Sequence, residues 1–184
     1  MKSARLQPLT AEAPEAAPEL QAPWAAFQLQ GGTWERADGT IDSVQWVDLP
    51  DASGLDLEAL EPVYFDWVPR LSVGMVSHRG REEMSLACEP FRFPTLIRLE
   101  PAKRTETTRT RGILGGMLAY PGGSIGFATY ALPAGTRLVV AVRALKPRLP
   151  RWLYFIVQAQ MHERSTFGFL RQIAAATLRA SSDC

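Results

Sequence analysis

The chain has 184 residues, of which 46% are apolar and 21% are charged, and its formal net charge is +1. This length allows a core with room for an internal cavity, and the near-zero net charge gives no reason to expect nucleic-acid binding. Two cysteines, Cys88 and Cys184, exclude a disulfide framework and a zinc site built from cysteines. No apolar segment follows Lys2 and Arg5, and no run reaches the ~18 to 20 apolar residues that span a bilayer. We therefore expect a cytoplasmic protein.

The charges are unevenly distributed along the chain. Residues 1–66 contain twelve Asp and Glu against three Lys and Arg, whereas residues 67–184 contain seventeen Lys and Arg against seven Asp and Glu. We expect the acidic part to pack beside the basic part within one domain. The alternative is a basic face for an anionic partner or a membrane.

The first half of the chain predicts an unstructured arm followed by short elements. Residues 1–22 are rich in Pro, Ala and Glu and are expected to be a disordered arm, before a single domain at 23–180 and a tail at 181–184. A turn signal at 37–40 predicts a hairpin between residues 33–36 and 41–47. One short helix is expected within 50–61 and is ended by Pro62. Short extended segments follow, each limited by a proline, at residues 63–67, 71–76, 84–88 and 96–99.

Residues 103–111 alternate threonine with charged side chains, so that neither face of an extended strand would be apolar. This pattern is typical of a solvated edge strand, whose charges discourage aggregation. The functional alternative is that Arg109 and Arg111 face a cavity or an anionic ligand.

The last eighty residues carry the clearest pattern. Turns at Pro121-Gly122-Gly123 and Pro133-Ala134-Gly135 predict a three-stranded meander from residues 117–120, 124–132 and 136–145. A helix of about 43 Å is then expected from Trp152 to Ala180, and Gly168 within it suggests either close packing or a kink. The predicted inward stripe of this helix consists of Trp152, Ile156, Ala159, Phe167, Leu170, Ile173 and Ala174.

Two segments resemble the end of a known superfamily. The sequence from Met117 to Leu145, with Gly135-Thr136-Arg137-Leu138 at its last strand, and the following Lys146–Tyr154 resemble the final strands and closing helix of the START-like, pollen-allergen-like (SRPBCC) superfamily of bacterial and other proteins. The likeness covers roughly residues 84–180, and the region before Asp51 departs from the usual pattern. The resemblance implies an α+β helix-grip fold, in which a curved antiparallel sheet grips a long C-terminal helix. It also implies a cavity between them for apolar ligands such as lipids, sterols, polyketides or quinones.

The sequence contains no recognisable catalytic or metal-binding motif. His78 and His162 are far apart without a carboxylate or cysteine set, no G-x-S-x-G elbow occurs, and the glycine-rich segments lack the features of a phosphate loop. We therefore expect no catalytic residues, no metal and no cofactor, and favour binding of a hydrophobic small molecule over catalysis. One alternative is a cyclase or aromatase-type enzyme with His162 and Glu163 as acid/base groups.

The candidate ligand-binding residues are aromatic or polar side chains, together with Ile156 of the helical stripe, that could wall a cavity or orient a ligand. Core packing is the alternative for each aromatic, and a solvent-exposed pair is the alternative for His162 and Glu163. They are Trp67, Phe91, Arg109, Tyr120, Phe127, Tyr130, Trp152, Ile156, His162 and Glu163. Lys146, Arg148 and Arg151 precede an aromatic segment, a combination that occurs at membrane surfaces, with a solvated loop as the alternative. Besides the hydrophobic ligand, the sequence is compatible with two further partners, a membrane surface in peripheral contact and a second copy of the chain in a homodimer.

Overall fold

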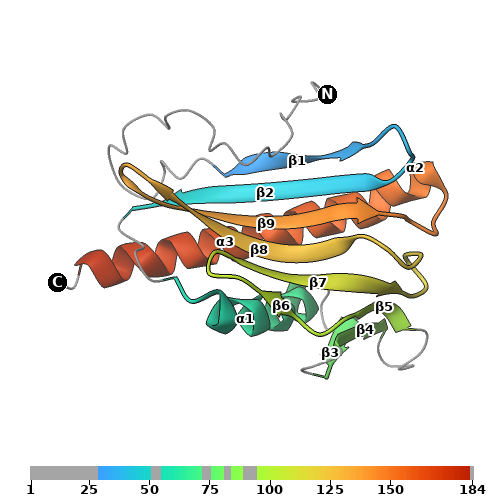
Figure 1. The fold of residues 1–184 in the computed structure, drawn as a ribbon, viewed down its shortest axis with the longest axis horizontal. Coiled ribbons are helices and arrows are strands. Elements are labelled where there is room, and N and C mark those ends of the chain that lie inside the picture. The colour runs from blue at the N-terminus through green and yellow to red at the C-terminus, as the bar shows by residue number, and fades with distance from the viewer. Residues whose placement is uncertain (1–28, 51–54, 72–75, 81–83, 89–94, 183–184) are drawn as a thin grey trace.

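A computed structural model of the chain describes residues 29–50, 55–71, 76–80, 84–88 and 95–182 (Figure 1). The predicted disordered arm at 1–22 and the last two residues of the predicted tail lie outside this range. The described residues form an α+β fold in which a curved antiparallel sheet grips a long C-terminal helix. The predicted fold class is therefore confirmed.

The sheet has nine strands in the order β1-β2-β9-β8-β7-β5-β4-β3, and β6 pairs separately with β7. Every neighbouring pair is antiparallel. Because β2 pairs with β9, the first hairpin extends the C-terminal meander into one continuous surface. The strands are β1 (Gln30–Glu35), β2 (Ile41–Leu49), β3 (Val76–Arg79), β4 (Met84–Cys88), β5 (Thr95–Leu99), β6 (Lys103–Arg104), β7 (Thr108–Gly115), β8 (Ser124–Leu132) and β9 (Gly135–Leu145).

The helices lie on one face of this sheet. The C-terminal helix crosses behind β2, β9 and β8, and α1 lies beside it (Figure 1). The helices are α1 (Leu57–Leu71), α2 (Arg151–Leu153), the π-helical turn η2 (Tyr154–Gln158) and α3 (Ala159–Ser182). Any cavity between sheet and helices is therefore walled by both α1 and the C-terminal helix.

The predicted first hairpin is confirmed by β1 and β2. Their register pairs Gln30 with Trp46 and Glu35 with Ile41. The turn between them places Gly39 at φ 77°, a conformation that glycine adopts without strain. The inward side chains of β2 are buried, including Val47 and Leu49.

The predicted helix end at Pro62 is wrong, and so is the predicted extended segment at 63–67. Asp56 Oδ1 accepts the backbone N–H of Glu58 at 2.8 Å, so α1 begins late and Pro62 falls within its second turn. A proline there costs about 3 kcal/mol, but the following turns bury Tyr64 and Phe65. Tertiary packing therefore outweighs the local penalty. Most of the segment predicted at 71–76 lies outside the described residues.

The predicted edge strand at 103–111 is only partly correct. A tight turn, in which the N–H of Thr105 donates to the carbonyl of Thr108 at 2.9 Å, separates the two-residue β6 from β7. The strand β7 is an interior strand of the sheet, paired with β8 on one side, and it buries Ile113. The charged pattern covers only the first half of β7, and the apolar half begins after Gly112.

The predicted meander is confirmed for β8 and β9, but residues 117–120 are not its third strand. That place is taken by β7. Gly115 has φ 105° and turns the chain out of the ladder. The next residues instead reach back to β5, where the N–H of Met117 donates to the carbonyl of Thr95 at 3.0 Å.

The C-terminal helix has the predicted extent but contains a π-helical turn. The N–H of Ala159 bonds to the carbonyl of Tyr154, five residues earlier, and the extra residue rotates the preceding turn by about 100°. Trp152 and Ile156, both predicted to face inward, are consequently 65% exposed, whereas Tyr154 is buried. Beyond the turn the predicted stripe holds, since Ala159, Leu170 and Ala174 are buried and Phe167 and Ile173 are partly buried.

Tyr64 is the centre of the aromatic core. Its ring makes edge contacts with Phe65, Phe127 and Phe169 at centroid distances of 5.4, 5.3 and 5.1 Å. Its hydroxyl lies 3.2 Å from Thr166 Oγ1. These contacts join α1, β8 and α3 at the end of the space between the helices and the sheet.

Ion pairs connect the acidic and basic parts of the chain, which confirms that the two parts pack together. Arg36–Asp42 and Glu100–Lys103 each lie within one part of the chain. Six other pairs of the described residues join an acidic residue of the first 66 positions to an arginine of the remainder, and in most of them the carboxylate is more buried than its partner. The pairs are Glu35–Arg151 (2.5 Å), Asp42–Arg143 (3.1 Å), Asp48–Arg137 (2.6 Å), Glu58–Arg104 (2.5 Å), Glu61–Arg111 (2.6 Å) and Glu61–Arg109.

Candidate functional site

A cavity of about 490 Å³ lies between the sheet and the helices. Its size is in the range of small-molecule sites, roughly 300 to 1,000 Å³. Apolar side chains from every side line it: Val68 of α1, Leu86 of β4, Ile97 of β5, Ile125 of β8 and Val142 of β9. The alternation of the strands explains this, because the same sheet face that carries the core also carries the cavity wall. The cavity therefore suits an apolar ligand.

Two polar side chains interrupt the apolar wall on the helical side. Gln158 at the end of η2 and His162 in α3 both line the cavity. Among the described residues, Gln158 Oε1 and His162 Nε2 are buried and have no hydrogen-bond partner. Burial lowers the pKa of His162 to about 4, so its imidazole is neutral near pH 7. Gln45 Oε1 and Trp46 Nε1 of β2 are also buried without a hydrogen-bond partner in the described part of the chain, but unlike Gln158 and His162 these residues do not line the cavity.

The two tyrosines of the cavity wall keep their protons. Burial raises the pKa of Tyr64, although its contact with Thr166 acts in the opposite direction. Burial also raises the pKa of Tyr154, and the charge of Glu163 adds to that effect. Both hydroxyl groups are therefore neutral over the physiological range. The wall of the cavity presents neutral groups, apart from Arg164, whose side chain is exposed.

His162 lines the cavity; the other predicted site residues that the structure describes do not. Phe127 is buried in the adjacent aromatic core. Trp67 packs on α3 and donates from Nε1 to the carbonyl of Ser165 at 3.0 Å. Glu163, the neighbour of His162, is partly buried but is not part of the wall. Phe91 lies outside the described residues.

The remaining predicted site residues are distributed over the surface and the ion-pair network. Arg109 donates to Glu61. Tyr120 is 43% exposed, with Arg148 Cζ 4.5 Å from its ring centroid. Tyr130 is partly buried on β8, away from the cavity, and Trp152 and Ile156 are exposed on the first turns of the C-terminal helix.

Tyr154, Gln158 and Met161 line the cavity but were missed by the sequence analysis. The sequence does not indicate the π-helical turn. A regular helix extended from Ala159 toward the N-terminus would place Ile156 and Trp152 inward in place of these residues. A second apolar stripe beginning at Tyr154 was the one available indication in the sequence.

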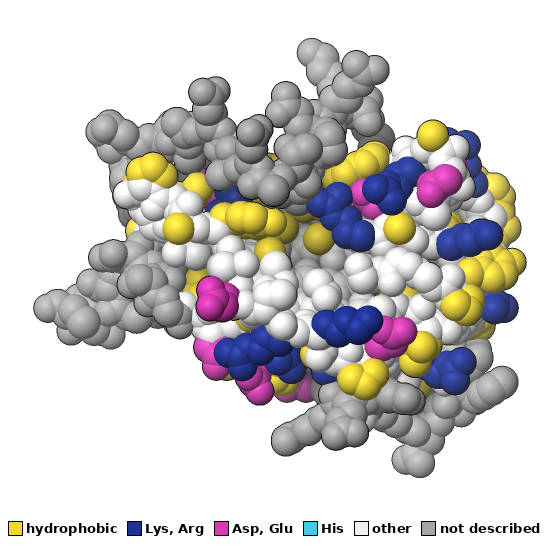
Figure 2. Space-filling model, viewed as in Figure 1, with side chains coloured by type: hydrophobic (Ala, Val, Ile, Leu, Met, Phe, Trp, Pro, Cys, Tyr) yellow, Lys and Arg dark blue, Asp and Glu magenta, His cyan; other side chains and the backbone are white. Residues whose placement is uncertain are grey.

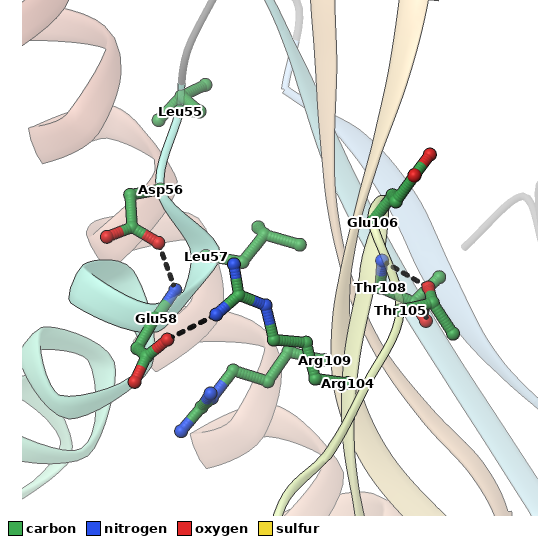
Figure 3. Close-up of a pocket in the computed structure, with 9 residues that line it drawn as sticks. All are labelled: Leu55, Asp56, Leu57, Glu58, Arg104, Thr105, Glu106, Thr108 and Arg109. Atoms are coloured by element: carbon green, nitrogen blue, oxygen red, sulfur yellow. Dashed lines mark hydrogen bonds and ion pairs between the residues drawn. The ribbon is translucent and has the colours of Figure 1, made fainter.

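A second hollow, of about 290 Å³, lies between the start of α1 and the β6–β7 turn (Figure 3). Its wall is charged rather than apolar. Several of its side chains already bind one another (Figure 3), since Glu58 pairs with Arg104 and Asp56 caps α1. Arg104 Nη1 lies 2.5 Å from Glu58 Oε2. Because these charges are satisfied within the protein, the apolar cavity is the stronger candidate site.

No helix in the described part of the chain combines the length and the apolar character needed to cross a membrane. Within the same residues, no three His, Cys, Asp or Glu side chains gather as ligands for a metal ion would.

Comparison with known proteins gave weak structural similarities, among them two structures of CalU16. No family model and no curated protein matches the sequence. The solution NMR structure of CalU16 from Micromonospora echinospora is similar over 79% of this chain and 72% of CalU16, with 13% identity and a TM-score of 0.39. The crystal structure of CalU16 is similar over 84% of this chain and 95% of CalU16, with 14% identity and a TM-score of 0.38. Similarities at this level carry no conclusion about function.

Proposed function

We propose that this protein binds a hydrophobic small molecule, such as a lipid, a polyketide or a quinone-like compound, in the cavity between the sheet and the C-terminal helix, without covalent chemistry. The observation that carries the proposal is the cavity of about 490 Å³, whose wall is apolar except for a few polar groups on the helices. Removing apolar ligand surface from water contributes about 25 cal/mol per Å², which is enough to drive binding in such a site. Membership of the SRPBCC superfamily is part of the same proposal.

The first experiment is native mass spectrometry of freshly purified protein, together with organic extraction of any bound molecule. A stoichiometric apolar compound would support the proposal and identify the ligand class. Apo protein should then be titrated with the neutral fluorescent probe N-phenyl-1-naphthylamine. We expect saturable binding of one probe per chain.

A pair of variants on the same strand tests whether the probe occupies this cavity. Ile125→Trp adds a large ring to the wall and is expected to weaken probe binding at least tenfold, whereas Tyr130→Trp, outside the cavity, is expected to leave it unchanged. The proposal is rejected if no molecule co-purifies and the probe does not bind, or if both variants bind the probe like the wild type.

Acid–base catalysis by His162 and Glu163 receives less support from the geometry. Of the two residues, His162 lines the cavity and Glu163 does not. A catalytic pair would need both groups within hydrogen-bond reach of the substrate. Binding without a reaction therefore accounts for the site with fewer assumptions.

A second candidate function is docking on an anionic membrane surface, from which an apolar ligand could enter. Val157 and Met161 line the cavity and are also 42% and 49% exposed, and the exposed Trp152 and Ile156 lie on the same helical segment. Figure 2 shows basic and hydrophobic side chains interleaved at the end of the molecule where α2 begins, at the right. Basic residues beside exposed aromatic and aliphatic side chains favour anionic interfaces.

Vesicle flotation tests this second candidate. Phosphatidylserine vesicles should bind the protein at low salt, binding should weaken steeply as salt increases, and Trp152→Ala combined with Ile156→Ala should reduce it. Tyr130→Ala serves as the control, because Tyr130 lies on the sheet away from this segment. Absence of binding at low salt, or equal binding by the double variant, rejects membrane docking without affecting the cavity proposal.

A further inference from the structure

The helical wall of the cavity holds two hydrogen-bonding atoms that the described part of the protein leaves unused. Gln158 Oε1 and His162 Nε2 are buried and have no partner there, and both side chains line the cavity. Four positions separate the residues, so that they lie one turn apart on the same face of the helix, with Cβ atoms roughly 5 to 6 Å apart. A chemical group bound at this face of the helix would therefore lie near both side chains.

Neighbouring hydroxyl groups are already engaged elsewhere. Tyr64 shares a hydrogen bond with Thr166 at 3.2 Å, and Ser165 donates from Oγ to the carbonyl of His162 at 2.9 Å. Each buried polar atom that is left unpaired lowers the stability of the folded protein. A ligand that satisfies both atoms gains this free energy, whereas a purely apolar ligand does not. The two atoms thus act as a selective feature in an otherwise permissive cavity.

The chemistry of the two atoms defines the group that fits them. A carboxamide oxygen accepts hydrogen bonds, and a neutral imidazole nitrogen either accepts or donates one. A hydroxyl group can donate its proton to Gln158 Oε1 and at the same time accept a hydrogen bond from His162 Nε2, when that nitrogen carries the imidazole proton. A carboxylate can only accept, so it would face the amide oxygen unfavourably. Tyr154 also lines the cavity, and because its neutral hydroxyl both donates and accepts, it is compatible with the same group.

We propose that Gln158 and His162 form a subsite for the hydroxyl group of a neutral amphiphile, so that the ligand is an alcohol or a phenol on an otherwise apolar body. This inference rests on the proposed function, because it names the class of ligand for the same cavity. Arg164 is the feature that favours a carboxylate instead, but its side chain is exposed at the rim of the cavity.

Three probes that differ at one position test the proposal: 4-octylphenol, octylbenzene and 4-octylbenzoate, titrated by calorimetry into apo protein at pH 7.5 in the same co-solvent. We expect 4-octylphenol to bind about tenfold more tightly than octylbenzene, which is the size of one net hydrogen bond gained in a buried site. The benzoate should bind more weakly than the phenol.

Variants locate the preference on the two residues. Gln158→Met and His162→Phe keep the wall filled but remove its polar atoms. Each should reduce the preference for the phenol over octylbenzene, and the double variant should abolish it. Octylbenzene binding should persist in all of them, which also shows that the cavity is intact. Glu163→Gln is the matched control on the same helix, and it should retain the tenfold preference because Glu163 is not part of the wall.

The outcomes separate this inference from the proposed function. If none of the three probes binds to the wild type and N-phenyl-1-naphthylamine does not bind either, the proposed function fails. If N-phenyl-1-naphthylamine binds and none of the three probes does, the hydroxyl subsite is wrong while the container function stands. If octylbenzene binds as tightly as the phenol, or if the preference survives in the double variant, the hydroxyl subsite is wrong while the container function stands. Tighter binding of 4-octylbenzoate than of 4-octylphenol would also overturn the hydroxyl subsite. It would indicate that Arg164 binds the polar end of the ligand.

Discussion

Arg111 Nε of β7 lies 2.6 Å from Glu61 Oε1 of α1, and the two side chains are 4% and 3% exposed. Arg109 donates to the other carboxylate oxygen of Glu61, and Arg111 Nη1 donates to the carbonyl of Glu100 at 3.0 Å. One carboxylate therefore holds two arginines of a central strand against α1. Because Tyr64, Phe65 and Val68 of the same helix wall the cavity, this ion-pair cluster also positions the ligand site.

Glu61→Ala is expected to destabilise the protein by about 3–5 kcal/mol, because it leaves buried guanidinium charges without their carboxylate. Urea unfolding monitored by tryptophan fluorescence measures this change. Glu58→Ala is the matched control, since Glu58 also pairs with an arginine, Arg104, but both of these side chains are more than half exposed. Exposed pairs contribute at most about 1 kcal/mol. Equal effects of the two substitutions would contradict the structural role given to Glu61.

The stability of the protein should depend on pH through His162. Its pKa is about 4 in the folded state against 6.5 for an ordinary histidine. Between these values the unfolded chain binds a proton that the folded protein excludes, so the free energy of unfolding falls as the pH decreases from about 6.5 to about 4, by up to about 3 kcal/mol. Above pH 6.5 the contribution is constant.

His162→Phe isolates this effect. The variant should lose the part of the pH dependence between pH 4 and 6.5 that belongs to His162, and it should be at least as stable as the wild type because a buried polar atom without a partner is removed. Thermal unfolding at half-unit pH steps provides the comparison. Identical pH profiles for the two proteins would show that the imidazole is solvated in the folded state.

The sequence predicts the sheet well where turn chemistry and alternation agree. Strands β8 and β9 follow from their Pro-Gly and Pro-Ala-Gly turns, and β1 and β2 from the turn at residues 37–40. The helix α1 was mispredicted because Pro62 is a strong local signal, whereas the burial of Tyr64 and Phe65 that overrides it is a property of the whole fold. The place of residues 117–120 likewise depends on their contact with β5, far along the chain.

The site was less predictable than the fold. His162 was selected because it interrupts an apolar helical stripe, and it does line the cavity. Trp152 and Ile156 were selected by the same periodicity and are exposed, because one π-helical turn changes the phase of the helix before Ala159. Arg109 was a candidate because of its charge. Its partner Glu61 is the last residue of the predicted helix, whereas in the structure α1 continues to Leu71.

Arg137→Lys should destabilise the protein by roughly 1–2 kcal/mol. Arg137 binds Asp48 with two parallel hydrogen bonds of 2.6 and 2.8 Å across the β2–β9 pair, and its guanidinium lies 5.6 Å from the centroid of the Trp46 ring. A lysine keeps the charge but cannot form the paired hydrogen bonds or stack in the same way. Chemical denaturation measures the change, and Arg104→Lys, at an exposed pair, should change stability by less than about 0.5 kcal/mol.

The effect of Gly168→Ala on the free energy of unfolding should depend on Trp67. A Cβ atom at Gly168 would lie 3.0 Å from Trp67 Cζ2, so of the two predicted reasons for this glycine, close packing or a kink, the structure shows close packing. The indole cannot withdraw freely, because its Nε1 donates to the carbonyl of Ser165 at 3.0 Å. We therefore expect Gly168→Ala to destabilise the protein by about 1 kcal/mol, although alanine by itself favours a helix over glycine by a similar amount.

A double-mutant cycle tests this dependence. In a Trp67→Leu background the ring is absent, so Gly168→Ala should become stabilising by up to about 1 kcal/mol, and the coupling free energy between the two positions should exceed about 1 kcal/mol. Urea unfolding of the four proteins measures it. Additive effects would mean that the indole moves away from the new methyl group at little cost, and that Gly168 is present for a reason other than its contact with Trp67.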